Sequence, residues 1–225
     1  MTIRTHTWLL FLAIAASGLI GCGNSSTTSP IANPITPPKQ GSVFRYHSYS
    51  FDSAGVKLPS SDVYDSNRVA AVGITYQGKT NVTQFVWGDG YTSYCNYEPN
   101  GDISRYIDGN GAIGFKNGWL VEPIATRVKQ TLNEEDTASV AWARLESSSS
   151  AYVGASQLTF ANHAFQAVTT EVTSAWSDGK SGIVETISWA PEIGTFVMTN
   201  TPWGGKPHND NKTGFREELI GYTLQ

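Results

Sequence analysis

Nucleophilic chemistry in this sequence would have to come from one of two cysteines, Cys22 and Cys95. A catalytic thiol needs a nearby histidine or another positive group to lower its pKa. Beyond the first 21 residues the histidines are His47, His163 and His208. None of them is close to Cys95 in the sequence or part of a recognisable motif, so we predict that Cys95 is a small buried hydrophobe in a strand. Alternation places it on one face with Tyr91, Ser93 and Tyr97.

The sequence gives equally little support for a catalytic serine or a metal site. No Gly-x-Ser-x-Gly motif occurs, and the histidines form no close pair that would hold zinc, so we predict no catalytic residue and no resident metal or other cofactor. Calcium is the one alternative, because 108–111 and 209–211 are rich in Asp and Asn, whose oxygens suit a hard cation. Neither segment completes an EF-hand loop.

Carboxylates offer a second route to chemistry. A glycan hydrolase needs two acids on facing strands, but Asp89, Asp102 and Asp178 each lie in or near a turn, where Asp is common for local reasons. Hydrolysis of envelope glycans by carboxylates that only the fold brings together therefore stays an alternative function.

Aromatic side chains are the strongest candidates for binding. Trp87, Tyr91 and Tyr94 crowd one expected hairpin, and Trp203 lies between Pro and Gly residues in an expected loop over 201–207. Such rings often form cross-strand pairs and core, but they can also stack on a sugar face or line an apolar pocket. We take these four residues as candidate ligand-binding residues.

The elements that must position these rings are predicted to be strands. Ten segments show period-two or β-branched and aromatic patterns: 43–51, 67–76, 82–87, 91–97, 102–107, 139–145, 164–176, 183–189, 195–199 and 215–222. Dipeptides typical of hairpin turns separate many of them, including Gln77-Gly78, Asp89-Gly90 and Asn100-Gly101. The one helix candidate, 124–133, could equally be a strand and loop, and the serine run 147–150 is expected to be a solvated loop. We predict an all-β fold in a single domain: a large curved antiparallel sheet or open barrel with hairpin connections.

The N-terminus carries an export signal. Arg4 precedes the apolar run 8–16, which is too short to cross a bilayer core of roughly 20 residues. The run leads into Leu19-Ile20-Gly21-Cys22, which resembles the lipobox of bacterial lipoprotein precursors at all four positions. This resemblance implies cleavage after Gly21 and a diacylglycerol thioether on the Cys22 sulfur, usually with acylation of the new amino group. Several acyl chains hold a protein on a membrane where one does not.

The segment after Cys22 is expected to be a tether. Residues 22–40 are rich in Ser, Thr and Pro and have no periodic apolar pattern. We therefore divide the chain into a signal peptide over 1–21, a lipidated tether over 22–40 and a β domain over 41–225. By the sorting rule of the lipoprotein family, Gly23 instead of Asp after the lipidated Cys implies the outer membrane in a Gram-negative source.

The C-terminal end carries a weaker resemblance. The segment 189–197, a Trp-Ala-Pro-Glu-Ile-Gly turn and a strand, together with 217–222 is similar to the ending of many uncharacterised β-rich bacterial envelope lipoproteins. The resemblance implies a large curved sheet and assigns no activity.

Charge removes one class of partner. With 15 Lys and Arg against 19 Asp and Glu, the net charge of −4 gives no field that would collect nucleic acid. The sequence therefore favours a non-enzymatic, lipid-anchored envelope lipoprotein. Its aromatic-rich sheet would bind an apolar ligand, a glycan or a partner protein in the periplasm or at the cell surface.

Overall fold

The computed structural model describes residues 35–52, 54–108, 114–127, 130–132, 139–140, 143–176, 182–204 and 214–225. The chain divides into two compact units, residues 1–30 and 31–225, and all the described residues belong to the second. Within these ranges the protein is all-β, as predicted, and no helix is long and apolar enough to cross a membrane.

The described residues form thirteen strands, all joined in antiparallel pairs. They are β1 (Val43–Phe51), β2 (Val63–Tyr76), β3 (Lys79–Trp87), β4 (Thr92–Tyr97), β5 (Ile103–Asp108), β6 (Gly114–Glu122), β7 (Gln130–Leu132), β8 (Ser139–Val140), β9 (Ala143–Phe160), β10 (His163–Trp176), β11 (Gly182–Ala190), β12 (Thr195–Gly204) and β13 (Gly214–Thr223). Most neighbours in the sheet are also neighbours in sequence, which is what tight hairpins require.

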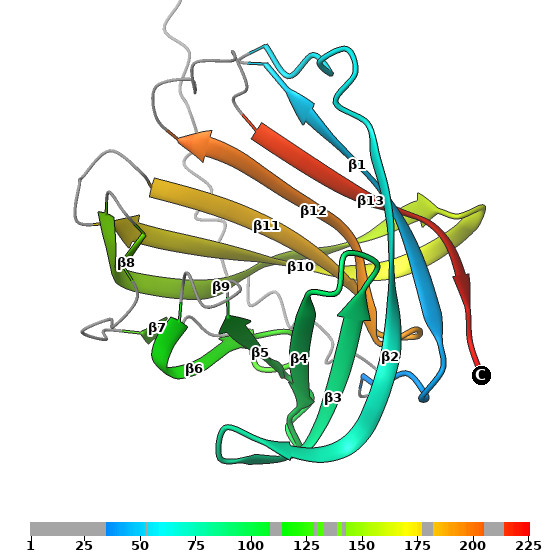
Figure 1. Ribbon diagram of the computed structural model, residues 1–225, viewed down its shortest axis with the longest axis vertical. Coiled ribbons are helices and arrows are strands. Elements are labelled where there is room, and N and C mark those ends of the chain that lie inside the picture. The colour runs from blue at the N-terminus through cyan, green and yellow to red at the C-terminus, as the bar shows by residue number, and fades with distance from the viewer. Residues whose placement is uncertain are drawn as a thin grey trace, which may run out of the picture. The chain divides into compact units, whose positions relative to one another are not determined.

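One pairing turns this meander into an open barrel. The order is β6-β5-β4-β3-β2-β1-β13-β12-β11-β10-β9-β7, so the first and last strands meet at the middle of the sheet. The sheet curls until β2 to β5 face β10 to β12, and it is nearly closed (Figure 1). Strand β6, at one end of this order, also contacts β9 and β7, which lie at the other end. The predicted open barrel with hairpin connections is confirmed.

The turns form where Gly was predicted to form them. Gly78, Gly90 and Gly101 have φ values of 78°, 87° and 90°, a region that residues with a Cβ seldom adopt. For the segment 124–133 the strand-and-loop alternative holds, because a turn at 124–126 precedes β7.

Strand β9 corrects the prediction that the serine run 147–150 is a solvated loop. The run lies inside an 18-residue strand and pairs with both β10 and β7. Ser148 and Ser150 are buried, and the Ser150 hydroxyl donates a hydrogen bond of 3.0 Å to Glu122. Ser carries a loop signal in sequence, but here its small size and its hydroxyl suit a crowded polar interior.

The core lies inside the curled sheet. Strand β1 alternates as expected: Phe44 and Tyr46 are fully buried, whereas Arg45 on the other face is exposed. Side chains from β4, β5, β10, β11 and β12 complete one continuous apolar cluster. The side chains on the concave face therefore decide both stability and any internal site.

The packed domain begins before Gly41. Ile35 is buried in the core cluster, and Thr36 and Pro38 lie against the turn at Gly194. A Cβ on Gly194 would come within 2.3 Å of the Thr36 carbonyl oxygen. Residues 35–40, assigned to the tether from their composition, thus pack along the barrel, because an apolar side chain can be buried without any regular element.

Candidate functional site

A cavity of about 220 Å³ opens inside the curled sheet, between β2 to β5 on one side and β11 to β13 on the other. Its aromatic lining residues are Phe85, Trp87, Tyr91, Tyr106, Trp189, Phe196 and Phe215. The remainder are Asn67, Ser93, Cys95, Arg105, Glu185, Ile187, Thr195, Thr199, Thr201 and Glu217. Aromatic walls with a few polar groups are typical of small-molecule sites.

Packing between the rings fixes the floor of this cavity. Phe196 stacks on the buried Tyr46 ring at 4.7 Å between centroids, and Trp87 lies 5.7 Å from Tyr46. Trp189 meets Phe196 edge-on at 6.1 Å. The Trp87 indole donates a hydrogen bond of 3.2 Å to Ser93 Oγ, which holds that ring against β4. These side chains are therefore preorganised and do not need a ligand to order them.

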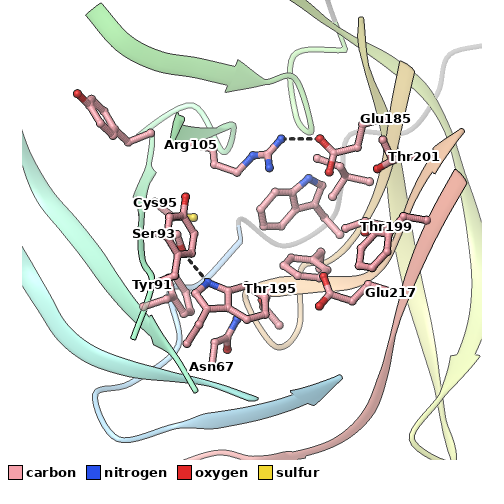
Figure 2. Close-up of a pocket in the computed structure, with 17 residues that line it drawn as sticks. Asn67, Tyr91, Ser93, Cys95, Arg105, Glu185, Thr195, Thr199, Thr201 and Glu217 are labelled. Atoms are coloured by element: carbon pink, nitrogen blue, oxygen red, sulfur yellow. Dashed lines mark hydrogen bonds and ion pairs between the residues drawn. The ribbon is translucent and has the colours of Figure 1, made fainter. Parts of the chain in front are cut away.

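A buried charge network forms one end of the cavity. Arg105 Nη2 lies 3.3 Å from a carboxylate oxygen of Glu185 (Figure 2). It also lies 3.3 Å from a carboxylate oxygen of Glu122. Glu122 is completely buried and also accepts hydrogen bonds from Thr170 and Ser150. Burial raises the pKa of Glu122, while Arg105 and the hydroxyls partly offset that rise. Burial alone would lower the pKa of Arg105, but the two carboxylates outweigh it and raise the pKa.

Glu217 is the contrasting carboxyl group. Figure 2 shows it on the β13 side of the cavity, apart from the Arg105–Glu185 pair. No described Lys, Arg or His forms an ion pair with it, and its hydrogen-bond donor is Ser48 Oγ at 3.3 Å. Burial raises the pKa of Glu217 to about 7, and the acidic Glu185 and Asp65 add to the rise. The group therefore changes charge near neutral pH.

Three polar atoms in the lining residues have no hydrogen-bond partner among the described residues. They are Asn67 Oδ1, Trp189 Nε1 and Arg105 Nε. Asn67 and Trp189 are only 2% and 3% exposed. An unmet buried donor or acceptor costs about 1–3 kcal/mol, and native proteins usually satisfy such atoms. These atoms lie within the wall and expose almost no surface, so packing among the described residues leaves their hydrogen-bonding capacity unmet.

The structure brings together two of the four predicted binding residues. Trp87 and Tyr91 line the cavity. Tyr94 does not, because alternation along β4 directs it to the opposite face, where it stacks on Tyr76 at 3.6 Å. The backbone of Trp203 pairs with Ile183, and its side chain lies outside the described residues.

The predicted loop over 201–207 is wrong for its first four residues. Residues up to Gly204 extend β12, and Pro202 pairs with Gly214 on β13. The strand continues through Pro202 because β11 and β13 pair with residues on both sides of it. Pro and Gly indicated a loop, but pairing on both edges overrides that local signal.

Other predicted positions fall outside the described residues. Cys22 lies there, and so do 209–211 and most of 108–111, the segments with calcium ligand types. Within the described ranges, no group of three His, Cys, Asp or Glu side chains is arranged to hold a metal ion.

The turn acids have the expected local role only in part. Asp89 accepts a hydrogen bond from the Tyr91 amide at 2.8 Å. The buried Asp102 accepts a local bond from the Asn100 side chain and three long-range bonds, from the Ala125 and Thr126 amides and the Thr126 hydroxyl. Asp178 lies outside the described residues. Cys95 is a buried free thiol, as predicted, and burial raises its pKa to about 12. It is therefore a poor nucleophile.

The charged site residues were missed by sequence reasoning. Arg105, Glu185 and Glu217 lie inside strands, at positions that alternation assigns to the same face as buried residues. A charge on an otherwise apolar face was the signal that could have found them.

Comparisons with known proteins find similarity among solved structures alone, at low sequence identity. No protein-family model and no curated protein matches the chain. One similar solved structure is a protein from Bacteroides fragilis that is provisionally named an exported protein and is described as having a YmcC-like fold. It aligns with 11% identity and a TM-score of 0.43, over 84% of this chain and 99% of its own. A provisionally named lipoprotein from Parabacteroides distasonis aligns with 12% identity and a TM-score of 0.42, over 84% and 98%.

Proposed function

We propose that this protein is a lipid-anchored lipoprotein of the bacterial envelope whose β domain binds a small ligand in its internal cavity without chemically altering it. The observation that carries the binding role is a preformed cavity of about 220 Å³ with an aromatic wall, in which the carboxyl group of Glu217 has no cationic partner among the described residues. A core that served stability alone would not keep an unbalanced carboxyl group in such a space.

Cavity size supports a single small ligand over a complete lipid. A dry cavity of about 150 Å³ accepts one benzene ring, and this cavity measures about 220 Å³. One six-membered ring with its substituents fits that volume, whereas the acyl chains of a diacyl lipid do not. Of the ligand classes that the sequence left open, a ring-sized polar molecule suits the site best.

The proposed attachment of the protein to the membrane is supported by the sequence alone. The lipobox at Leu19–Cys22 and the apolar run before it direct the protein to the envelope, and Gly23 favours the outer membrane in a Gram-negative host. Acyl chains on Cys22 would hold the domain at the membrane, and the intervening residues would let the cavity face the surrounding fluid.

The anchor is tested by Cys22→Ala. We expect this variant to lose lipid labelling and membrane partitioning, while Cys95→Ala, a matched change at the other cysteine, keeps both. Membrane association of Cys22→Ala equal to that of the wild type would contradict the anchor.

Ligand binding is tested by native mass spectrometry of the mature lipoprotein extracted from its own host in detergent. We expect a retained small molecule in the wild type. We expect it to be lost when Ile187→Trp fills the cavity from a buried wall position. Absence of any adduct in both proteins, together with no binding of the ring probes described below, would refute the binding role.

A second candidate function has one observation in its favour. Glu185 and Glu217 line the same cavity, and the pKa of Glu217, raised by burial to about 7, suits a general acid. A glycan hydrolase uses two carboxyl groups in one site. Glu185, however, is held by Arg105 and so is not free to act as nucleophile or base. Release of reducing sugar from isolated envelope glycans by the wild type but not by Glu217→Gln would establish the enzyme instead.

A further inference from the structure

Glu217 differs from the other acids near the cavity in having no cationic partner among the described residues. Glu185 and Glu122 share the guanidinium of Arg105, which leaves no net positive charge at that end of the site. The groups facing Glu217 from neighbouring strands are acidic or neutral: Asp65 on β2, Glu185 on β11, and Tyr46 and Ser48 on β1. A negative charge entering the cavity would therefore be repelled, and a positive one would be attracted.

Aromatic rings strengthen this preference for a cation. Phe196, Phe215 and both cavity tryptophans line the same space as Glu217. A cation over such a ring face gains about 0.5–2 kcal/mol, most where water is excluded. A carboxylate and aromatic walls together form the kind of enclosure that binds ammonium groups.

Neutral hydrogen-bonding groups complete the site. Thr199 and Thr201 line the cavity, and a threonine hydroxyl can both donate and accept a hydrogen bond. A hydroxyl on the ligand can pair with such a group. A ligand with an ammonium group and at least one hydroxyl on a ring matches all of these features.

We infer that the cavity binds a ring-sized amino alcohol, with the ligand's ammonium group on Glu217, and that it rejects anionic ligands of the same size. This inference rests on the proposed binding function and specifies the chemical class of its ligand. It sets a direction for pH as well: a protonated Glu217 cannot pair with an ammonium group, so affinity for the amine should rise with pH up to about 7 and level off above it.

Three probes of one shape test this inference. They are trans-4-aminocyclohexanol, cyclohexane-1,4-diol and 4-hydroxycyclohexanecarboxylate, which share a ring and a hydroxyl and carry a positive, a neutral and a negative second group. Binding of each to the mature lipoprotein in detergent is measured by calorimetry at pH 8 and pH 5. At pH 8 we expect the amine to bind at least about tenfold more tightly than the diol, and the carboxylate more weakly than the diol. At pH 5 we expect most of the amine's advantage to disappear.

Two matched variants locate the effect. Glu217→Gln keeps the shape of the side chain and should lower affinity for the amine to that of the diol, with diol affinity unchanged as proof of an intact cavity. Glu218→Gln removes the neighbouring charge on β13, where Glu218 pairs with Arg216 and does not line the cavity, and should change neither affinity.

Each outcome decides a separate point. Equal affinities for amine and diol at pH 8, or an amine preference that survives Glu217→Gln, overturn the inference and leave ligand binding intact. Tighter binding of the carboxylate also overturns it and moves the site to Arg105. Failure of all three probes overturns the inference, and it refutes the binding function too if no ligand is retained from the host.

Discussion

Two aromatic clusters lie on the two faces of the same strands, and they differ in how their polar groups are satisfied. The first is the cavity. The second, called here the Tyr94 cluster, consists of Tyr76, Tyr94, Tyr106 and Trp119, whose rings stack or meet edge-on across β2, β4, β5 and β6. Tyr106 also borders the cavity.

In the Tyr94 cluster the indole group and the neighbouring cation have partners. The Trp119 indole donates a hydrogen bond of 3.1 Å to the Gln77 carbonyl, and Lys79 lies 5.4 Å from the Trp119 ring while pairing with Glu98. In the cavity, Trp189 Nε1 and Asn67 Oδ1 have none among the described residues, and Glu217 has no cation. Aromatic content alone therefore does not identify a site, and the proposed site is distinguished by the carboxyl group of Glu217, which has no cationic partner among the described residues.

The largest expected difference between the clusters comes from removing their cations. Arg105→Met leaves the fully buried Glu122 without its counter-charge, which should lower the free energy of unfolding by about 3–5 kcal/mol at pH 8. Lys79→Met breaks a half-exposed pair and should cost at most about 1 kcal/mol. Urea unfolding followed by tryptophan fluorescence measures both.

A second substitution shows whether that cost is electrostatic. Glu122→Gln added to Arg105→Met removes the stranded charge, so it should restore part of the lost stability. If the double variant is no more stable than Arg105→Met, the loss comes from packing, and the charge contrast between the clusters does not hold.

The next effect is the pH dependence of stability, which should have opposite signs in the two clusters. Burial raises the pKa of Glu217 from roughly 4.3 in the unfolded chain to about 7. The folded state then binds the extra proton, so the contribution of Glu217 to stability is full below about pH 4 and is lost as pH rises to 7, by up to about 3 kcal/mol. Glu217→Gln should be more stable than the wild type at pH 8 and lose less stability between pH 5 and pH 8.

Glu98 supplies the opposite case. Burial would raise its pKa, but Lys79 and the Ser104 hydroxyl outweigh burial and lower it. Its contribution is therefore present above its unfolded pKa and disappears as pH falls through the folded value, by less than about 1 kcal/mol for such a partly exposed pair. Acid titration of unfolding in Glu98→Gln checks this, and the same sign of change in both glutamine variants would contradict the comparison.

A smaller effect separates the two indoles. Trp119→Phe and Trp189→Phe remove similar volumes from buried positions, so their packing losses should be alike. Only Trp119 also loses a hydrogen bond, to Gln77, and it should therefore cost about 1 kcal/mol more. Equal denaturant midpoints for the two variants would mean that Trp189 Nε1 has a partner in solution.

Much of this fold follows from local patterns. Alternation in 43–51 correctly placed Phe44 and Tyr46 on one face, and the Gly dipeptides marked three turns. The errors lie where tertiary contacts override a local signal. Ser147 to Ser150 have loop-like composition, yet they are in β9 because two neighbouring strands pair with them. Strand β6 carries no clear alternation and was missed.

The site was less accessible than the fold. Trp87 and Tyr91 could be proposed because rings are conspicuous in sequence, and the structure adds that Tyr94 alternates away from them. Arg105, Glu185 and Glu217 come from three strands separated by up to 112 positions, and only the closure of β1 on β13 brings those strands around one space. The sequence could not predict that the carboxyl groups of Glu185 and Glu217 line one cavity, because this depends on how β1 and β13 pair.

The smallest expected effect concerns Tyr94, the one predicted binding residue that faces away from the cavity. Tyr94→Leu loses its stack on Tyr76, a cross-strand contact worth roughly 0.2–1 kcal/mol, so unfolding should change only slightly. Affinity for trans-4-aminocyclohexanol should not change. Tyr91→Leu, three residues earlier and in the cavity wall, should weaken that affinity at least about threefold because part of the aromatic enclosure is lost. Calorimetry on both variants, with fluorescence to confirm folding, decides the point. If Tyr94→Leu reduces binding as much as Tyr91→Leu does, the ligand contacts the Tyr94 cluster, and the face of the sheet assigned to binding is the wrong one.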